Sequence, residues 1–213
     1  MRDMHCHILP GVDDGAVDMD ESLAMLAAAK RAGITEIVCT PHCRKPYFDY
    51  EKMWDAYNQL LQVSDIPIDM GFEVNYTMLA KLGWEWIDVL SFYQTGEFLL
   101  ELNTHCTRAD FDNYFRAIYE IQGRGHQVII AHPERYHAIQ EDISLAYELV
   151  DMGCLLQAST DFVEGGRFGK ERKPAKKLLK EGLYTYFASD AHNVGHYDCF
   201  TKAWKKYGKY MNQ

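Results

Sequence analysis

Histidine and carboxylate side chains recur in this sequence at the ends of apolar segments, with spacings that suit metal binding. His5 and His7 are two positions apart near the start of the chain, and Asp190 and His192 are two positions apart after the apolar run 183–188. Side chains two positions apart on an extended backbone point to the same face. Each pair therefore presents two possible metal-binding side chains on one side of the chain.

Nine side chains of this kind are candidate metal ligands because they stand at or near the ends of expected strands. They offer nitrogen and oxygen atoms without cysteine, a set that suits manganese, iron or zinc. Nine ligands are too many for one ion with open positions, so the set predicts two or three divalent ions that share a carboxylate. The candidates are His5, His7, Asp14, His42, Glu73, Glu101, His132, Asp190 and His192.

The elements that must position these residues are strands alternating with helices. A first strand is expected to end at His5 and His7, and six further apolar segments follow. Those segments are 34–40, 66–73, 97–102, 126–132, 154–158 and 183–188. Helices are expected over 18–33, 50–63, 78–82, 109–122, 144–152, 173–181 and 199–209. Nearly apolar strands separated by helices are typical of a parallel sheet covered on both faces. We therefore expect an α/β protein, a distorted seven-stranded TIM-like barrel with its site at the C-terminal ends of the strands.

Length and composition fit one domain over residues 1–213, with 47% hydrophobic and 25% charged residues. No apolar run has the length of a membrane span, and no signal peptide is recognisable, so a cytoplasmic protein without membrane insertion is expected. The net charge of −9 argues against a general nucleic-acid binder.

The six cysteines are scattered and are expected to be reduced and mostly buried. Cys39 and Cys43 could form half of a zinc clip, but no second pair completes it.

Six segments give the sequence a resemblance to a known family. They are 3–15 (DMHCHILPGVDDG), 40–42 (TPH), 71–73 (GFE), 100–102 (LEL), 131–136 (AHPERY) and 189–193 (SDAHN). The chain resembles the PHP (polymerase and histidinol phosphatase) superfamily and, within it, the bacterial capsule-type metal-dependent protein-tyrosine phosphatases. The His-x-His pair alone is shared with amidohydrolases, whereas the HxHxLPGxDDG opening together with HPERY is specific. The resemblance extends from the first residue to about Asn193.

This resemblance implies a PHP fold with a trinuclear site, manganese being the expected ion and iron or zinc the alternatives. Asp13 is the alternative to Asp14 as a ligand. The implied groups are His5, His7, Glu73 and Asp190 for one ion, then Glu73, Glu101 and His132, then Asp14, His42 and His192.

The implied activity is phosphomonoester hydrolysis by a protein-tyrosine phosphatase linked to capsular or exopolysaccharide synthesis. A hydroxide that bridges two ions is the expected nucleophile. Arg135, Asp14 and His42 are the expected catalytic residues, because Arg135 can bind phosphate oxygens in a bidentate fork. Arg135, Arg44 and His196 are the expected substrate-binding residues. The expected partner is a phosphotyrosine protein, with a capsule-type tyrosine kinase as a candidate; the oligomeric state is not predicted.

The chain departs from the family after Asn193, where an Arg-Pro-Pro segment usually supplies an arginine that helps to hold phosphate. This chain has Val194, Gly195 and His196 there, and His196 is a candidate replacement. A histidinol-phosphatase-like or other small-molecule phosphatase therefore remains an alternative, as does a catalytically silent metal-binding partner of a tyrosine kinase.

Other readings are disfavoured by specific residues. No cysteine is followed six positions later by arginine, which excludes a cysteine-based tyrosine phosphatase. An amidohydrolase usually bridges its metals with a strand-ending lysine, and no expected strand ends in one. The segment 165–170 (GGRFGK) lacks the spacing of a P-loop and is expected to be a turn. His105, His126 and His137 are not expected to be ligands.

Overall fold

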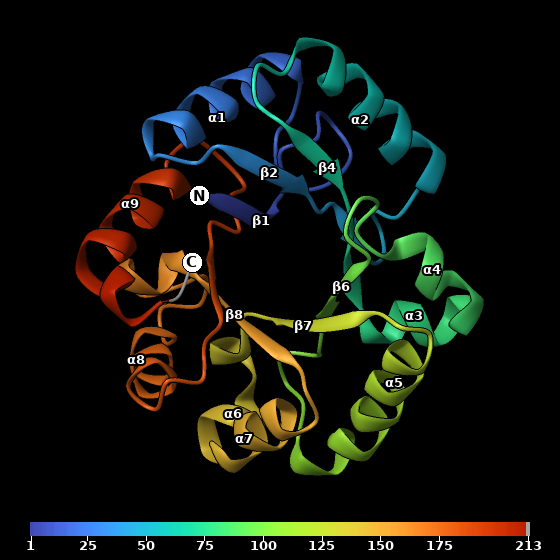
Figure 1. The fold of residues 1–213 in the computed structure, drawn as a ribbon, viewed down its shortest axis with the longest axis vertical. Helices are drawn as coiled ribbons and strands as arrows, with labels where there is room; N and C mark the ends of the chain where they lie inside the picture. Colours follow the sequence, from blue (N-terminus) through green and yellow to red (C-terminus); the bar gives the residue numbers. More distant parts are fainter. Residues whose placement is uncertain (212–213) are drawn as a thin grey trace.

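A computed structural model describes residues 1–211. Its strands curl around a common centre and its helices form the outer layer, as Figure 1 shows. All strand pairs are parallel. The α/β class and the curled parallel sheet predicted from the sequence are therefore confirmed.

The strands form two hydrogen-bonded sheets. The first has the order β1 (Arg2–Cys6), β2 (Glu36–Cys39) and β4 (Ile68–Met70). The second has the order β3 (His42–Cys43), β5 (Glu73–Asn75), β6 (Glu97–Glu101), β7 (Gln127–Ala131), β8 (Leu155–Ser159) and β9 (Tyr186–Ala188). The prediction of one seven-stranded barrel is wrong, because the main sheet has six strands and is not closed.

Two expected strands are interrupted, and these interruptions divide the sheet. The segment 34–40 gives only β2; β3 follows after Pro41, which has no N–H to donate to a strand neighbour. The segment 66–73 gives β4 and the first residue of β5, on either side of Gly71, where a Cβ atom would lie 2.2 Å from the Phe92 ring. At each break the chain passes from the first sheet to the second, which apolar periodicity does not show.

The loop after β9 connects the two outer edges of the sheets. The Asp190 N–H donates to the His5 carbonyl and the His7 N–H donates to the Ala191 carbonyl, each at 2.8 Å. The pairing is one isolated bridge between Cys6 and Ala191 and not a continuous ladder. These few bonds place the His5–His7 pair directly beside the Asp190–His192 pair.

The outer layer contains helices α1 to α9. Their bounds are Met19–Arg31, Tyr50–Val63, Tyr76–Leu82, Ile87–Leu90, Phe111–Gly123, His137–Glu141, Ser144–Asp151, Arg172–Lys180 and His196–Tyr207. Short 3₁₀ segments cover Trp84–Trp86, Arg108–Asp110, Pro133–Arg135, Thr160–Glu164 and Gly208–Tyr210. The helix expected from Asp18 has that residue as its N-cap, since the Asp18 side chain accepts from the Glu21 N–H, while the Glu21 carboxylate accepts from the Val17 N–H one residue before the cap. The short helices α4 and α6 were not expected.

Most apolar side chains are buried in one large cluster, and a smaller cluster forms a second core. The smaller cluster contains Met4, Val38, Phe92, Leu99, Ile129, Ala131 and Ala188. All six cysteines are free and buried, as predicted. Among residues 1–211 there is no helix with both the length and the apolar character that crossing a membrane requires.

Candidate metal centre

The structure brings all nine predicted ligands to one end of the strands. They come from the ends of β1, β3, β5 and β6 and from the loops that follow β1, β7 and β9. Their nitrogen and oxygen atoms form four overlapping groups in which the atoms lie within 4.8 Å of one another. The C-terminal edge of a parallel sheet is where strand-end residues from different parts of the chain converge.

Two of the candidate ligands have an unusual backbone. His132 (φ 32°) and Asp190 (φ 50°) are the only non-glycine residues with positive φ within residues 1–211. A non-glycine residue in this region costs on the order of 1–3 kcal/mol and persists only where the surrounding structure holds it. Both follow a strand, β7 or β9, at the point where the chain turns. The strained turns carry the His132 imidazole and the Asp190 carboxylate, two groups that the site uses.

Four buried side chains form what we call the inner group: His5, His7, Glu73 and Asp190. The Nε2 atoms of His5 and His7 face each other at 3.2 Å. Each lies 3.4 Å from Asp190 Oδ1 and 3.6 Å from a Glu73 carboxylate oxygen. None of these side chains exposes more than 2% of its surface. Both imidazoles of the inner group are thus within 4 Å of both carboxylates.

Glu73 also belongs to a second group, the bridging group, with Glu101 and His132. Its Oε1 atom lies 2.7 Å from His132 Nε2. Its Oε2 atom lies 2.5 Å from His42 Nδ1. Because the two oxygens of Glu73 reach different histidines, this carboxylate has the geometry of a bridging ligand.

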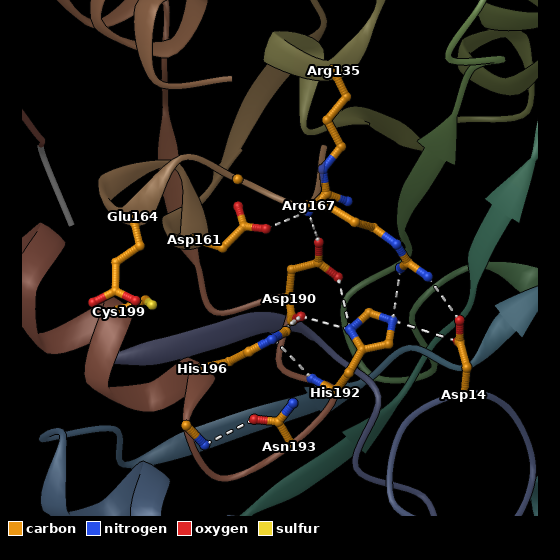
Figure 2. A pocket seen from close by; sticks show the side chains of 12 residues that line it. Asp14, Arg135, Asp161, Glu164, Arg167, Asp190, His192, Asn193, His196 and Cys199 are labelled. Atoms are coloured by element: carbon orange, nitrogen blue, oxygen red, sulfur yellow. Dashed lines mark hydrogen bonds and ion pairs between the residues drawn. The ribbon is translucent and has the colours of Figure 1, made fainter. Parts of the chain in front are cut away.

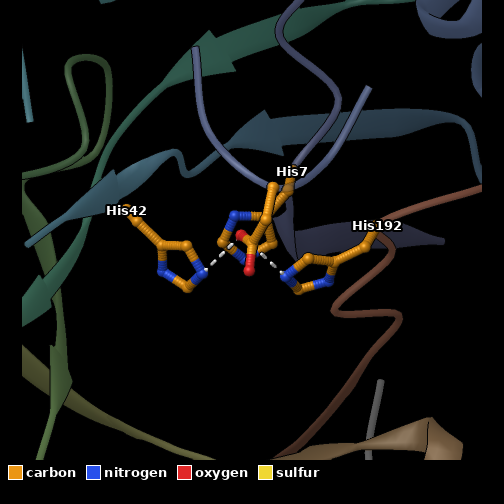
Figure 3. A group of neighbouring side chains, drawn as sticks. His7, His42 and His192 are labelled. Atoms are coloured by element: carbon orange, nitrogen blue, oxygen red, sulfur yellow. Dashed lines mark ion pairs between the residues drawn. The ribbon is translucent and has the colours of Figure 1, made fainter. Parts of the chain in front are cut away.

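The remaining ligands, Asp14, His42 and His192, form the outer group. Asp14 Oδ1 lies 3.0 Å from His42 Nε2 and 3.5 Å from His192 Nε2. The His7 ring stacks on His192 at 4.1 Å and also belongs geometrically to this group. Figure 3 shows His42 and His192 on opposite sides of His7. The His7 ring therefore belongs to the inner group and also borders the outer group.

The charges of these groups strongly perturb one another. Burial opposes protonation of His5, but the carboxylates of Asp190 and Glu73 outweigh it and raise the His5 pKa to about 9. Burial likewise opposes protonation of His42, whose pKa rises to about 10 because of Glu73 and Asp14. The pKa of Glu73 falls well below its ordinary value, since His42 and His5 overcome the effect of burial. The positive charges of the imidazoles thus balance the negative charges of the neighbouring carboxylates. Bound cations would take over this role.

The residues present fit divalent ions. Several buried ligand atoms in the site make no well-formed hydrogen bond, although charged groups lie close to them: Asp14 Oδ1, His42 Nδ1, Glu73 Oε2 and Asp190 Oδ2. Buried polar atoms without well-formed hydrogen bonds are costly in a folded protein and call for an explanation. Ions held between these atoms would satisfy them, and an all-nitrogen-and-oxygen donor set suits manganese, iron or zinc.

Two residues outside the predicted ligand set orient the histidines. Asp13 Oδ2 lies 2.8 Å from His7 Nδ1 and accepts from the His42 N–H at 3.0 Å. Gln157 Oε1 lies 2.9 Å from His5 Nδ1. An acceptor on the far nitrogen fixes the ring and its tautomer so that Nε2 faces the metal. Gln157 was missed, although a lone amide in the otherwise apolar strand β8 was a usable signal.

The sequence predicted that Arg135 binds phosphate oxygens of the substrate. In the structure its guanidinium is instead engaged by neighbouring side chains. Its side chain is only 6% exposed, and Nη2 lies 2.6 Å from Asp190 Oδ2. The same nitrogen donates to Ser159 Oγ and to Asp161 Oδ2 at 3.1 and 3.2 Å. Burial disfavours the cation, but the Asp190 and Asp161 carboxylates raise the pKa of Arg135 above its ordinary value. Arg135 therefore holds the Asp190 carboxylate in place, and Figure 2 shows it directed at that group.

The other predicted substrate residues lie at the edge of the site. Arg44 Nη2 is 2.7 Å from His42 Nε2 and 3.7 Å from Asp14 Oδ2. His196 Nδ1 accepts from the His192 N–H at 3.2 Å, so this ring nitrogen supports the loop. His105, His126 and His137 lie outside the four groups, as expected.

Two cavities open onto the ligands. The larger, of about 700 Å³, is lined by Asp14, Arg135, Arg167, Asp190, His192 and His196, among others. Figure 2 shows these side chains around the opening. The smaller, of about 220 Å³, reaches Glu73, Glu101 and His132. Arg167 lines both cavities, although its segment was predicted to be merely a turn.

Comparisons with known proteins identify the family of this chain. The family model for capsular polysaccharide synthesis, CpsB/CapC, matches residues 1–213. The tyrosine-protein phosphatase YwqE of Bacillus subtilis is 35% identical, over 91% of this chain and 78% of that protein. The tyrosine-protein phosphatase CpsB of Streptococcus pneumoniae is 32% identical, over 91% of this chain and 84% of that protein.

A solved structure gives the same result. It is described as one of the crystal structures of YwqE from Bacillus subtilis and CpsB from Streptococcus pneumoniae, "unique metal-dependent tyrosine phosphatases". The TM-score is 0.80 at 30% identity, covering 98% of this chain and 88% of that one. With a family model that spans its whole length and relatives above 30% identity, this chain belongs to the CpsB/CapC family of capsular polysaccharide synthesis.

Proposed function

We propose that this chain is a metal-dependent tyrosine-protein phosphatase linked to capsular or exopolysaccharide synthesis. The observation that carries the proposal is the convergence of nine nitrogen- and oxygen-bearing side chains at one end of the strands, beside two cavities. Membership of the CpsB/CapC family and the names of the relatives support the same activity. The proposal includes one phosphatase domain over residues 1–213, a cytoplasmic location and a phosphotyrosine protein as substrate, with a capsule-type tyrosine kinase as the expected one.

The proposed cofactors are two or three divalent ions, with manganese expected and iron or zinc as alternatives. The inner group, the bridging group and the outer group would each hold one ion, with Glu73 shared between the first two. When bound, such ions lower the pKa of a water molecule and neutralise charge on the phosphate.

The chain itself contributes orientation and charge. Asp13 and Gln157 fix the rings of His7 and His5. Arg135 holds the Asp190 carboxylate in position through an ion pair with its Oδ2 atom. The outer group faces the larger cavity, through which a phosphomonoester would enter. The buried inner group keeps bulk water away from the ligands, which strengthens electrostatic interactions inside the site.

A phosphatase panel tests this proposal. Phosphate release is measured with manganese on phosphotyrosine peptides, histidinol phosphate and sugar phosphates, before and after chelation. We expect metal-dependent turnover that favours the peptides. Absence of metal-dependent turnover on every phosphoester would support a silent binding partner, and a preference for the small substrates would support a small-molecule phosphatase.

A pair of histidine variants provides the matched control. His5→Ala removes an inner-group ligand and is expected to abolish turnover. His126→Ala removes a histidine that contacts the Gly96 carbonyl and Asp88, away from the four ligand groups, and should leave turnover unchanged. Full activity in the His5 variant would show that the site has been assigned wrongly.

A further inference from the structure

The glycine-rich segment 165–170, which we call the 165–170 loop, is built in a fixed shape beside the metal centre. Its support is Glu171, a carboxylate that is only 1% exposed. Glu171 Oε1 accepts from the Phe168 N–H and Glu171 Oε2 accepts from the Lys170 N–H, both at 2.8 Å. Gly166 has φ 82°, and a Cβ there would lie 2.6 Å from the Glu171 side chain. The loop therefore presents Arg167 and Phe168 in a defined direction.

Arg167 points at the outer group. Its Nη2 donates to Asp14 Oδ2 at 3.0 Å, and its Nη1 lies 3.3 Å from His192 Nε2. The side chain remains 41% exposed and lines both cavities, and Figure 2 shows it reaching across the opening. These contacts are with two side chains of the outer group, although Asp14 turns its other oxygen, Oδ1, toward His42 and His192. An ion there would repel the guanidinium, which would remain at the cavity on its fixed loop.

Among the three arginines that line the two cavities, Arg167 has the fewest interactions with other side chains. Arg135 is buried and engaged by Asp190. Arg44 contacts His42 and lies over the Tyr47 ring at 5.7 Å. The sequence has no arginine after Asn193, where the family resemblance led us to expect one. Arg167 is also the most exposed of these three guanidinium groups, which makes it the one most accessible to a phosphate dianion.

Phe168, next in the loop, supplies an apolar surface beside the ligands. It is 56% exposed, an unusual state for such a large apolar side chain. It lines the smaller cavity together with Glu73, Glu101 and His132. An exposed ring beside a phosphate site is suited to packing against another aromatic ring.

On the basis of the proposed phosphatase function, we propose that the 165–170 loop is the substrate-recognition element of this site. Arg167 binds the phosphate oxygens of the substrate, and Phe168 packs against the tyrosine ring that carries the phosphate. The guanidinium offers two parallel N–H donors that match two phosphate oxygens. The aromatic contact favours aryl phosphates over alkyl phosphates, which defines the substrate class.

Calorimetric binding of three non-reacting anions to the manganese-loaded protein tests both residues. The anions are inorganic phosphate, methylphosphonate and benzylphosphonate. Arg167→Gln is expected to weaken all three by roughly tenfold or more, because a charge-assisted bidentate contact is lost. Arg167→Lys should be intermediate. Phe168→Ala is expected to weaken benzylphosphonate alone, by roughly threefold to tenfold, because only that anion carries a ring.

Matched controls and metal content separate recognition from structural effects. Arg108→Gln and Tyr119→Ala change an exposed arginine and an exposed tyrosine that line none of the cavities described here, and should leave all three affinities unchanged. Metal content, measured by elemental analysis, should be equal or higher in Arg167→Gln, because the guanidinium contacts ligand atoms.

Specific outcomes would overturn the inference without touching the phosphatase proposal. Unchanged phosphate affinity in Arg167→Gln, or loss of metal from it, would eliminate the role of Arg167. An unchanged ratio of benzylphosphonate to methylphosphonate affinity in Phe168→Ala would eliminate the role of Phe168. A wild-type protein that binds the anions but never hydrolyses phosphotyrosine would instead contradict the proposed function, and one that binds no anion would contradict both.

Discussion

The inner group and the outer group use similar side chains but differ in how the fold holds them. His5 and His7 in the inner group each have a second residue on the far ring nitrogen, and Asp190 has Arg135 behind it. Asp14 in the outer group is a quarter exposed, and Arg44 and Arg167 approach it from the cavity side. The inner group is therefore preorganised by buried contacts. The outer group instead borders the larger cavity and is partly open to solvent.

This difference predicts unequal roles. Ligands whose positions are fixed in advance lose little freedom on binding, so the inner group should bind its ion more tightly. The outer group can exchange an ion for a guanidinium, and its occupancy should respond to substrate and to metal concentration. Four experiments test this contrast, in order of expected effect.

The largest effect is expected at Glu73, which joins the inner and bridging groups. Glu73→Gln removes a charge that contacts His5, His7, His42 and His132. We expect turnover to fall by roughly a thousandfold or more, because several kcal/mol of metal-dependent charge stabilisation is lost. Metal content should fall by more than one equivalent. Glu148→Gln, at an exposed ion pair with Arg108, is the control; normal metal content in the Glu73 variant would contradict a bridging role.

A smaller effect is expected at Asp14. Asp14→Asn should remove about one equivalent of metal and slow turnover by roughly tenfold to a hundredfold, while the inner group stays loaded. Elemental analysis and kinetics on the same preparation measure both. If this variant lost all of its metal, the two groups would not be separable and the contrast between them would be wrong.

A third experiment tests whether the contact between Gln157 and His5 supports the inner group. Gln157→Leu leaves every ligand in place but removes the acceptor for His5 Nδ1. Metal affinity is expected to drop by roughly tenfold to a hundredfold for the most tightly bound ion. Gln127→Leu, in strand β7 at an exposed position, serves as the matched control. An effect confined to the weakest site would show that Gln157 does not support the inner group.

The smallest effect, counted per pH unit and per proton, is a pH dependence of metal binding. The pKa of His5 is raised to about 9 and that of His42 to about 10 in the metal-free protein, so both rings carry protons at pH 7. Burial and Arg135 instead lower the pKa of His132 to about 4, so that ring is already neutral. Binding must displace the first two protons, and affinity should rise as pH increases from 6 to 8, by roughly tenfold per pH unit for each proton.

Calorimetry in two buffers of different ionisation heat counts the protons released at pH 7. Release of protons during filling of both the inner and the outer group is expected, since each contains one of these rings. Metal binding that released no protons would contradict the charge state inferred from the geometry.

Several parts of the site were predictable because their signal is local. Glu73, His132 and Asp190 each follow or end a short apolar run, and such runs predict buried parallel strands. Parallel strands place their C-terminal ends on one edge, so the ligands could be grouped before any contact was known. The helix start at Asp18 was equally local, since its cap involves residues three and four positions apart.

Other parts depended on contacts between distant segments. Gln157 meets His5 across 152 positions, and Arg167 meets Asp14 across 153. The division into two sheets follows from Pro41 and from the close packing of Gly71 on Phe92, which apolar periodicity does not reveal. Arg135 looked like a phosphate-binding residue because its position after β7 was known but the position of Asp190 was not.

The amino-acid sequence alone therefore predicted the set of candidate metal-binding side chains and the strand ends that carry them, because residue type and apolar spacing are properties of neighbouring positions. The tertiary structure alone decided which of these side chains lie within reach of one another, which are held by a second residue and which loop lies beside them. Those relations depend on how the sheets curl and where they break, and curvature is set by packing among residues far apart in the chain.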